Sequence, residues 1–173
     1  MIFLTVGTQL PFDRLVKALD NWNTGQAPDR IFGQIADPGD KGYMPSNFYF
    51  KDFIDPDEFA QKYEEAKLIV AHAGMGSIIS ALTHPKPIVI MPRRADLYEH
   101  RNDHQLATAQ QFASREGIYV AKDEIVLGSL LDELLAKPNE ELAGQADAAH
   151  AGPELIAAVR SFIFADSKSG GKK

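Results

Sequence analysis

The sequence predicts one α/β domain in which helices cover both faces of a parallel β-sheet. Short apolar runs, rich in β-branched residues, alternate along the chain with longer amphipathic stretches. This alternation is typical of parallel sheets with crossover helices. The length of 173 residues suits a single domain. The hydrophobic share of 45% is that of a globular protein and is too high for a disordered one.

Six apolar runs are the predicted strands. Each run is short, and several consist almost entirely of large apolar residues, as expected for strands that are buried on both faces. In chain order the runs span residues 2–6, 30–36, 48–50, 67–71, 88–91 and 118–120.

Helices are predicted between these runs from apolar periodicity and from start signals. The large apolar side chains between Phe12 and Trp22 lie at helical spacing, and Pro11 favours the first turn of that helix. Asp55 has the features of a helix cap, because a proline follows it and Glu58 comes three residues later. The predicted helices cover residues 11–22, the segment from 55 onward, 78–82, 102–115 with Gly117 as its C-cap, 125–136 and 154–164.

The composition excludes several classes of protein. The chain has no cysteine, so it has neither a disulfide framework nor a thiolate zinc site, and a reducing compartment fits. No apolar run approaches the roughly 20 residues that span a bilayer, and the N-terminus lacks the basic region of a signal peptide. We therefore expect a cytosolic domain at residues 1–166, followed by a disordered tail at residues 167–173.

The formal charge of −6 is unevenly distributed along the chain. Residues 123–166 contain nine acidic and two basic residues, and we interpret this stretch as a solvated helical surface. The chain has no basic stripe, which argues against a nucleic-acid partner.

Three loops are candidates for a binding site. Ligands of parallel sheets bind at the carboxyl ends of the strands, so the residues that follow each predicted strand are the ones to consider. These are residues 7–11, 72–77 and 92–105.

The loop at residues 72–77 carries the strongest local signal. Gly74 and Gly76, with Met75 between them, let the backbone approach a ligand, and the helix that starts there directs free N–H groups toward it. Ser77 can cap the helix or donate to a phosphate oxygen, and His72 can add a hydrogen bond or a positive charge. The alternative is a tight turn with a helix cap and a satisfied histidine.

The turn at Gly7, Thr8 and Gln9 is the same kind of element after the first strand. Thr8 and Gln9 supply side-chain donors above the first helix. Every α/β protein has such a turn, so a purely structural role is the alternative. Two such loops after neighbouring strands converge on one crevice, which favours a shared anion site.

The segment 93–105 is a dense polar loop with three arginines, three acids and two histidines. Asp103 and Gln105 suit sugar or ribose hydroxyls, and Asn102 or Asp103 can cap the next helix. The arginines offer planar recognition of phosphate or carboxylate. The alternative is a salt-bridged surface loop. His100 and His104 have the spacing of zinc ligands, but no third ligand accompanies them, so we expect no metal.

Several common motifs are absent from the sequence. It has no GxSxG nucleophile, no Walker loop and no Gly-x-Gly after the first strand, which argues against a hydrolase and against the usual mode of NAD binding. The remaining possibility is a site that recognises a diphosphate and a ribose without these motifs.

Four motifs in matching order resemble the C-terminal domain of glycosyltransferase family 28, the MurG-like donor-binding half of GT-B enzymes. They are VGTQ at 6–9, HAGMGS at 72–77, KPIVIMPR at 86–93 and NDHQ at 102–105. The resemblance covers residues 1–164. It is strongest to the small subunits of split transferases, namely the eukaryotic subunit that completes dolichol-linked chitobiose and the bacterial PssE-like subunits of exopolysaccharide synthesis.

The resemblance implies a Rossmann-like sheet equivalent to the C-terminal half of a GT-B enzyme. It places the donor diphosphate at Gly7, Thr8, Gln9, His72, Gly74, Met75, Gly76 and Ser77. It places the sugar or the ribose at Ser80, Arg93, Asn102, Asp103, His104 and Gln105.

Ser80 departs from the family pattern. MurG-like and chitobiose-type members have a glutamate here that binds the ribose, whereas serine is shorter and uncharged, which argues against a bidentate grip. PssE-like members share this feature, so we place the chain in the exopolysaccharide branch. Arg93 and Arg94 would suit the carboxylate of a uronate donor.

The resemblance implies that the chain is the donor-binding subunit of an inverting UDP-sugar glycosyltransferase. It would add a hexose or hexuronate to a lipid-linked glycan, with no cofactor or metal. A membrane-anchored partner would bind the acceptor, supply the general base and hold the chain at the cytoplasmic side of the inner membrane. The predicted partner surface is Phe162, Ile163 and Phe164, with residues 48–50 as a second candidate, and core packing is the alternative for both.

Two other functions stay open from the sequence. The chain could be a non-catalytic subunit that activates a partner glycosyltransferase, or a UDP-sugar epimerase-like enzyme that needs no acceptor.

Overall fold

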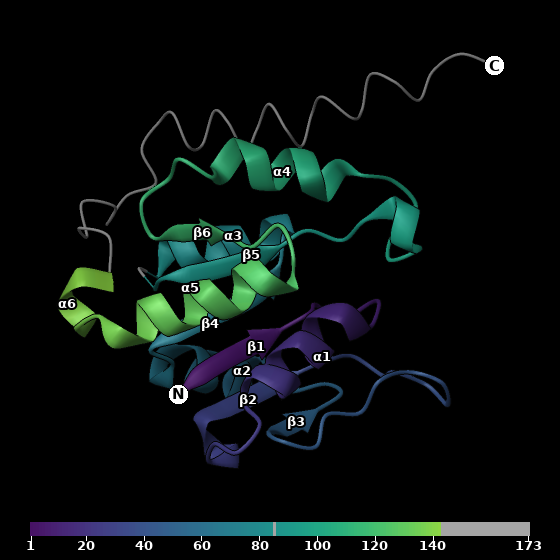
Figure 1. The fold of residues 1–173 in the computed structure, drawn as a ribbon, viewed down its shortest axis with the longest axis horizontal. Helices are drawn as coiled ribbons and strands as arrows, with labels where there is room; N and C mark the ends of the chain where they lie inside the picture. The colour runs from purple at the N-terminus through teal and green to yellow at the C-terminus, as the bar shows by residue number, and fades with distance from the viewer. Residues whose placement is uncertain (85, 143–173) are drawn as a thin grey trace.

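A six-stranded parallel sheet forms the centre of the protein. The computed structural model describes residues 1–84 and 86–142. The strand order is β3-β2-β1-β4-β5-β6, and every neighbouring pair runs parallel (Figure 1). The strands are β1 (Ile2–Thr5), β2 (Ile31–Gln34), β3 (Tyr49–Lys51), β4 (Leu68–His72), β5 (Ile88–Met91) and β6 (Ile118–Val120). The predicted parallel sheet is confirmed.

A helix follows every strand except β2. The α-helices are α1 (Asp13–Trp22), α2 (Pro56–Glu65), α3 (Met75–Thr83), α4 (His104–Phe112), α5 (Glu124–Ala136) and α6 (Asn139–Leu142). Two short 3₁₀ helices, Pro28–Arg30 and Ala95–Leu97, lie in connections. Within the described part of the chain, no helix combines the length and the apolar character that a membrane crossing needs.

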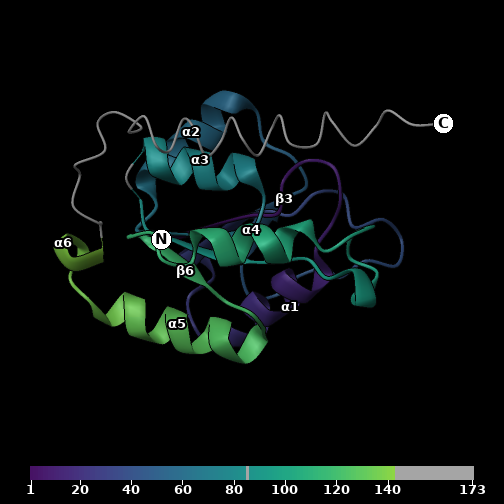
Figure 2. The same cartoon turned by 90° about the horizontal axis from the view of Figure 1, so that it is seen from above.

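The side chains of β1 show how the sheet divides the core into two layers. Ile2 and Leu4 pack with α1 and α5 on one face, whereas Phe3 packs with α2, α3 and α4 on the other. All three are almost fully buried, and each contributes about 2 kcal/mol through the apolar area that it removes from water. Figure 2 shows α2 and α3 on one side of the sheet and α1 and α5 on the other.

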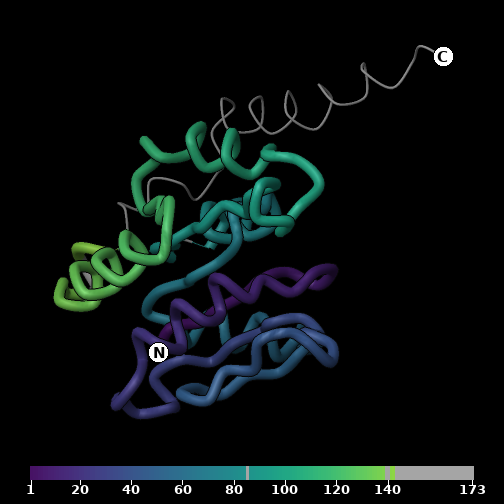
Figure 3. The backbone as a smooth tube through the Cα atoms, turned by 45° about the vertical axis from the view of Figure 1, so that its right-hand side comes forward, coloured from purple at the N-terminus to yellow at the C-terminus, as the bar shows by residue number. Residues whose placement is uncertain are grey.

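β1 and β4 lie side by side at the middle of the sheet. From β1 the chain moves outward to β2 and β3, and from β4 it moves outward to β5 and β6 in the opposite direction (Figure 3). The register pairs Ile2 with Leu68 and Thr5 with Ala71. The connections after β1 and β4 therefore diverge at one edge of the sheet, and parallel α/β sheets leave a crevice at this point.

Several predicted helix boundaries differ from the structure. α1 begins at Asp13 with Phe12 at its N-cap, so Pro11 precedes the helix and does not open it. α4 is shorter at both ends than the predicted segment 102–115. Gly117 has a φ of 78°, but it leads into β6 and does not cap α4, so that prediction was wrong.

The remaining helix predictions fall into three groups: one start is confirmed, some short helices were missed, and some segments lie outside the described residues. Asp55 is the N-cap of α2 and accepts a hydrogen bond from the Glu58 amide at 2.9 Å, which confirms that start. α6 and the 3₁₀ helices were not predicted because they are too short to show a periodic pattern. The predicted helix 154–164, the tail 167–173 and the candidate interface residues Phe162, Ile163 and Phe164 lie outside the described residues, so these and the domain limits stay predictions.

The second candidate for a partner surface is divided between the core and the solvent. Phe48 is buried in the core, and Phe50 packs against the same cluster. Tyr49, on the edge strand β3, is 60% exposed. Of this aromatic run, the Tyr49 side chain is therefore the one presented to solvent.

Asp20 of α1 anchors the long connection between β2 and β3. Its buried carboxylate accepts hydrogen bonds from the Tyr43 hydroxyl at 2.7 Å, the Ser46 amide at 3.1 Å and the Asn47 amide at 2.7 Å. Burial alone would raise the pKa of Asp20, but these donors outweigh it and hold the pKa below its ordinary value. The hydrogen bond to Asp20 raises the pKa of Tyr43 to about 12.

We expect Asp20→Ala to lower the free energy of unfolding by about 2–4 kcal/mol, because it removes a buried carboxylate and leaves several partly buried donors without an acceptor. Urea denaturation followed by circular dichroism measures the change. Asp40→Ala, at an exposed loop position, is the control and should have little effect. Equal destabilisation by the two variants would contradict the anchoring role of Asp20.

Candidate functional site

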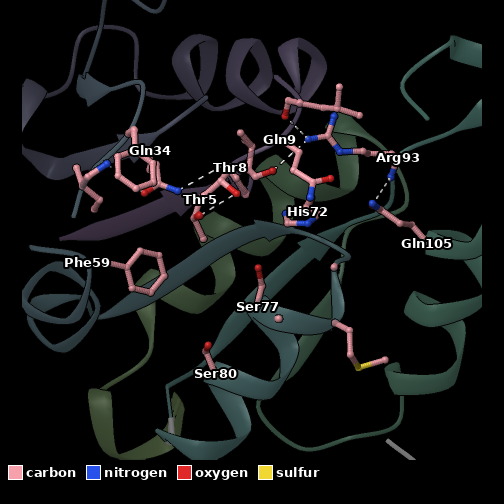
Figure 4. A pocket seen from close by; sticks show the side chains of 18 of the residues that line it. Thr5, Thr8, Gln9, Gln34, Phe59, His72, Ser77, Ser80, Arg93 and Gln105 are labelled. Atoms are coloured by element: carbon pink, nitrogen blue, oxygen red, sulfur yellow. Dashed lines mark hydrogen bonds between the residues drawn. The ribbon is translucent and has the colours of Figure 1, made fainter. Parts of the chain in front are cut away.

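An open pocket of about 670 Å³ lies at the carboxyl edge of the sheet, where β1 and β4 diverge (Figure 4). The structure brings most of the predicted site residues together here. Those that line the pocket are Gly7, Thr8, Gln9, His72, Gly74, Met75, Gly76, Ser77, Ser80, Arg93 and Gln105. Asn102, Asp103 and His104 are not among its lining residues.

The loop after β1 forms one wall of the pocket. Gly7 has a φ of 84°, a left-handed conformation that glycine adopts at little cost. Its carbonyl oxygen accepts a hydrogen bond from the Gln34 side chain at 3.4 Å. Thr8 and Gln9 follow at exposed positions on the pocket, so both can offer polar groups to a ligand.

The start of α3 forms the opposite wall. Gly74 is the N-cap and the first intrahelical hydrogen bond runs from the Ile78 amide to its carbonyl. The amides of Met75, Gly76 and Ser77 therefore have no acceptor within the helix, as at any helix N-terminus. Together with the helix dipole, these amides favour an anion.

Ser77 lies in the first turn of α3 and not at the N-cap, so the alternative prediction that it caps the helix is wrong. Ser80 lies one turn further along the same helix. Figure 4 shows both hydroxyls on the side of α3 that faces the pocket. Two hydroxyl groups and the helix N-terminus thus share one wall.

His72 separates the two glycine-containing loops. A Cβ atom on Gly74 would lie 2.1 Å from Nε2 of His72, and one on Gly7 would lie 3.1 Å from its Cε1. The imidazole therefore occupies the space that both glycines leave open. Apart from its chain neighbours and the backbone of its own helix, no heavy atom lies within 4 Å of a Cβ placed on Gly76, so that glycine has open space beside it in the pocket.

The imidazole of His72 is neutral at pH 7 in this site. Burial, followed by the charge of Arg93, lowers the pKa of His72 to about 4. In this structure His72 therefore carries no positive charge, and a charge contact of His72 with a diphosphate stays a prediction. The side chain offers hydrogen bonding instead.

Arg93 has a different role from the predicted one. Its guanidinium donates to the carbonyl oxygens of Val6 at 3.1 Å, Leu10 at 2.7 Å and Pro11 at 2.6 Å. It also stacks on Phe12, with Cζ 4.5 Å from the ring centroid. The side chain holds the loop after β1 from behind, and its planar fork is not directed at a ligand carboxylate.

The neighbouring Arg94 also fails to support a uronate site. Its guanidinium is exposed and pairs with Asp96 at 2.6 Å. Hydrogen bonding to Asp96 raises the pKa of Arg94 and lowers the pKa of Asp96. This pair is a surface ion pair, which was the alternative reading of the loop.

The rest of the loop before α4 is used for local contacts. Asp103 is at the N-cap of α4 but makes no side-chain cap, because its Oδ1 accepts from the Ala95 amide at 2.8 Å. Asn102 Oδ1 is hydrogen-bonded to the Nδ1 atoms of both His100 and His104. No cluster of three or more metal-ligating His, Cys, Asp or Glu side chains occurs in residues 1–84 and 86–142.

Besides Arg93, Gln105 and His100 are the residues of the segment 93–105 that line the pocket. Gln105 is buried, and its Oε1 accepts from the Arg93 amide at 3.1 Å. This contact fixes the side-chain amide and leaves its NH₂ group as the end available for a ligand. His100 was considered only as a metal ligand, so its position on the pocket was missed.

An apolar part of the pocket was also missed. It lies beyond Gln34, where the connection from β3 enters α2, and consists of Phe53, Ile54, Pro56 and Phe59. The rule that ligands bind at the carboxyl ends of strands could have identified this segment, because it directly follows the predicted strand 48–50. The pocket therefore has a polar side near α3 and an aromatic side near α2.

The comparison with protein families decides what kind of domain this is. The model of the glycosyltransferase family 28 C-terminal domain matches residues 1–159. The chain belongs to this family. The predicted resemblance is therefore confirmed at the level of the family, and the PssE-like branch stays a prediction.

Similar proteins are glycosyltransferases of several kinds. NDP-glycosyltransferase YjiC of Bacillus subtilis (strain 168) is 26% identical over 109 residues, which are 63% of this family 28 chain and 25% of that protein. MurG of Acinetobacter baumannii has a TM-score of 0.60 at 21% identity, over 91% of this chain and 48% of that one. The solution structure of ALG13 has a TM-score of 0.55 at 18% identity, over 92% of this chain and 93% of that one.

These likenesses establish the fold of the family 28 domain. The sheet and its helices match the C-terminal domains of GT-B enzymes, as the sequence predicted. The chain spans about a quarter of YjiC and about half of MurG.

The two glycines near α3 should respond differently to alanine. We expect Gly74→Ala to lower the free energy of unfolding by about 1–3 kcal/mol, because its methyl group displaces the His72 ring. We expect Gly76→Ala to raise it by about 0.5 kcal/mol, since the new methyl meets open space in a helix. Thermal and urea denaturation measure both, and equal effects would contradict the packing of His72 on Gly74.

The lowered pKa of His72 predicts a dependence of stability on pH. The unfolded state binds a proton near pH 6.5, whereas the folded state does so only near pH 4, so protonation favours unfolding between these values. We expect the free energy of unfolding to fall between pH 7 and pH 5 by up to about 2 kcal/mol more in the wild type than in His72→Gln. His84→Gln controls for the loss of a histidine, and identical pH profiles of wild type and His72→Gln would refute the assignment.

Proposed function

We propose that the chain is the donor-binding subunit of a two-chain UDP-sugar glycosyltransferase. One observation carries the proposal. The loop after β1 and the N-terminus of α3 face each other across a pocket of about 670 Å³, and both present unpaired polar groups to it. A nucleoside diphosphate linked to a sugar has the size and the chemistry for such a pocket.

The diphosphate would bind between these two walls. The amides of Met75, Gly76 and Ser77 and the Ser77 hydroxyl can donate to phosphate oxygens from one side, and Thr8 and Gln9 from the other. The same donors stabilise the charge that develops on UDP as it leaves the sugar, without a metal ion.

The two ends of the pocket suit the two ends of the donor. Phe53, Ile54 and Phe59 form the aromatic side, which favours a planar base through apolar and ring contacts. Gln105 lies across the pocket from Phe59 (Figure 4), and His100 also lines the pocket. The polar groups of both residues suit sugar hydroxyls. The ribose would then lie near Ser80.

The remaining half of the site would belong to a partner chain. The similarity to about half of MurG and to nearly all of ALG13 supports a separate subunit. The partner would bind a lipid-linked glycan, provide the general base and anchor the complex at the cytoplasmic membrane in exopolysaccharide synthesis. A hexose is the favoured donor sugar, because Arg93 and Arg94 are engaged elsewhere and do not support a uronate.

Binding of UDP tests the proposal directly. We expect calorimetry to show micromolar binding of UDP, and Ser77→Ala and Gln105→Ala each to weaken it roughly tenfold through loss of a hydrogen bond to the ligand or of the pocket shape. Ser129→Ala on α5 and Gln110→Ala, at an exposed position of α4, are matched controls that should bind as the wild type does.

Other outcomes point to the other functions. If UDP does not bind to the chain, alone or with a co-purified partner, the chain is not a donor subunit and an activating role is favoured. Conversion of a UDP-sugar by the chain alone favours an epimerase-like enzyme. Transfer of sugar that requires both chains supports the proposal.

A further inference from the structure

Among the lysines, arginines, aspartates and glutamates that the structure describes, Arg93 is the one that lines the pocket. The lining residues include no lysine, aspartate or glutamate. Arg93 is 3% exposed, so the charge lies inside the protein and behind the loop that carries Thr8 and Gln9. Figure 4 shows its side chain reaching toward that loop.

Within residues 1–84 and 86–142, no carboxylate forms an ion pair with this buried charge, although the charges of Glu99 and Asp13 act to raise its pKa. Among the ion pairs of the described residues none includes Arg93, whose guanidinium contacts carbonyl oxygens instead. The acid that could approach it, Glu99, is bound by Arg14 with N–O distances of 2.5 and 2.8 Å. Asp13 is exposed at the start of α1.

An unpaired buried cation is costly unless something compensates it. Burial lowers the pKa of Arg93 to about 10, which still leaves the guanidinium protonated at neutral pH. A polar pocket without carboxylates directly in front of this cation is a place where an anion lowers that cost. The charge already acts on the pocket, because it helps to lower the pKa of His72 on the pocket wall.

We propose that Arg93 is the countercharge of the pocket, a positioning residue that attracts a bound diphosphate without touching it. This inference rests on the proposed function. The guanidinium fixes the loop 7–11 through the carbonyls of Val6, Leu10 and Pro11. By donating to the Val6 carbonyl, it also polarises the peptide group whose N–H belongs to Gly7, an amide that already donates to the Thr5 hydroxyl at 3.4 Å.

The residue also connects the two sides of the polar pocket. Its side chain holds the loop after β1, and its backbone amide holds Gln105 Oε1 at 3.1 Å. The orientation of Gln105 and the shape of the Gly7–Gln9 turn therefore depend on one residue. Arg94, next in the chain, has neither contact and provides a matched control.

The test compares ligands that differ only in the diphosphate. Dissociation constants for UDP and for uridine are measured with wild type, Arg93→Met, Arg93→Lys and Arg94→Met, after circular dichroism has established that each variant is folded. We expect Arg93→Met to weaken UDP at least about tenfold more than uridine, since a charge–charge attraction is lost. Arg93→Lys keeps the charge and should stay near the wild-type ratio of UDP to uridine affinity, and Arg94→Met should leave both affinities unchanged.

A purely structural role predicts a different result. If Arg93→Met weakens UDP and uridine by the same factor, Arg93 supports only the fold of the loop and the inference is overturned. If Arg93→Met does not fold, Arg93→Gln replaces it in the same comparison. The inference is also overturned if Arg93→Lys has a ratio of UDP to uridine affinity as low as that of the neutral variant. If the wild type binds UDP but the ratio never changes, the inference alone fails, whereas absence of UDP binding to the wild type removes the proposed function as well.

Discussion

The pairing of β1 with β4 is the contact on which the whole site depends. Their parallel register sets Thr5 opposite Ala71, and the next residues bring Gly7 against the ring of His72. A shift of one residue would turn the side chains of β1 to the other face of the sheet and bury the wrong set. Because Ile2, Phe3 and Leu4 are all buried, the core on both faces holds this register, and the core thereby determines the geometry of the pocket.

The fold class and the positions of the main loops could be predicted from the sequence because both follow from local patterns. Strands that are buried on both faces read as continuous apolar runs, and β4 and β5 are of this kind. The N-cap at Asp55 depends on residues within one turn, so it too can be read locally. Once the strand ends are known, the carboxyl-edge rule selects the segments 7–11 and 72–77 without further information.

The roles of individual polar residues could not be predicted, because they depend on contacts between distant parts of the chain. Arg93 and Arg94 are identical in type and adjacent, yet one is buried against the carbonyls of the loop after β1 and the other is paired with Asp96 in solvent. Gln105 lines the pocket whereas Asp103 does not, although both suit sugar hydroxyls chemically. Whether each of these side chains reaches the pocket depends on the direction in which α4 starts and on how the loop after β1 packs against Arg93.

The packing of His72 against two glycines changes how glycine patterns in such loops should be interpreted. A glycine near a nucleotide site is usually attributed to the ligand, but at Gly7 and Gly74 the nearest atoms belong to an imidazole of the protein itself. The three positions form one steric unit, so they should covary among relatives. A smaller residue in place of His72 would permit alanine at position 74, whereas position 76 would vary independently of both.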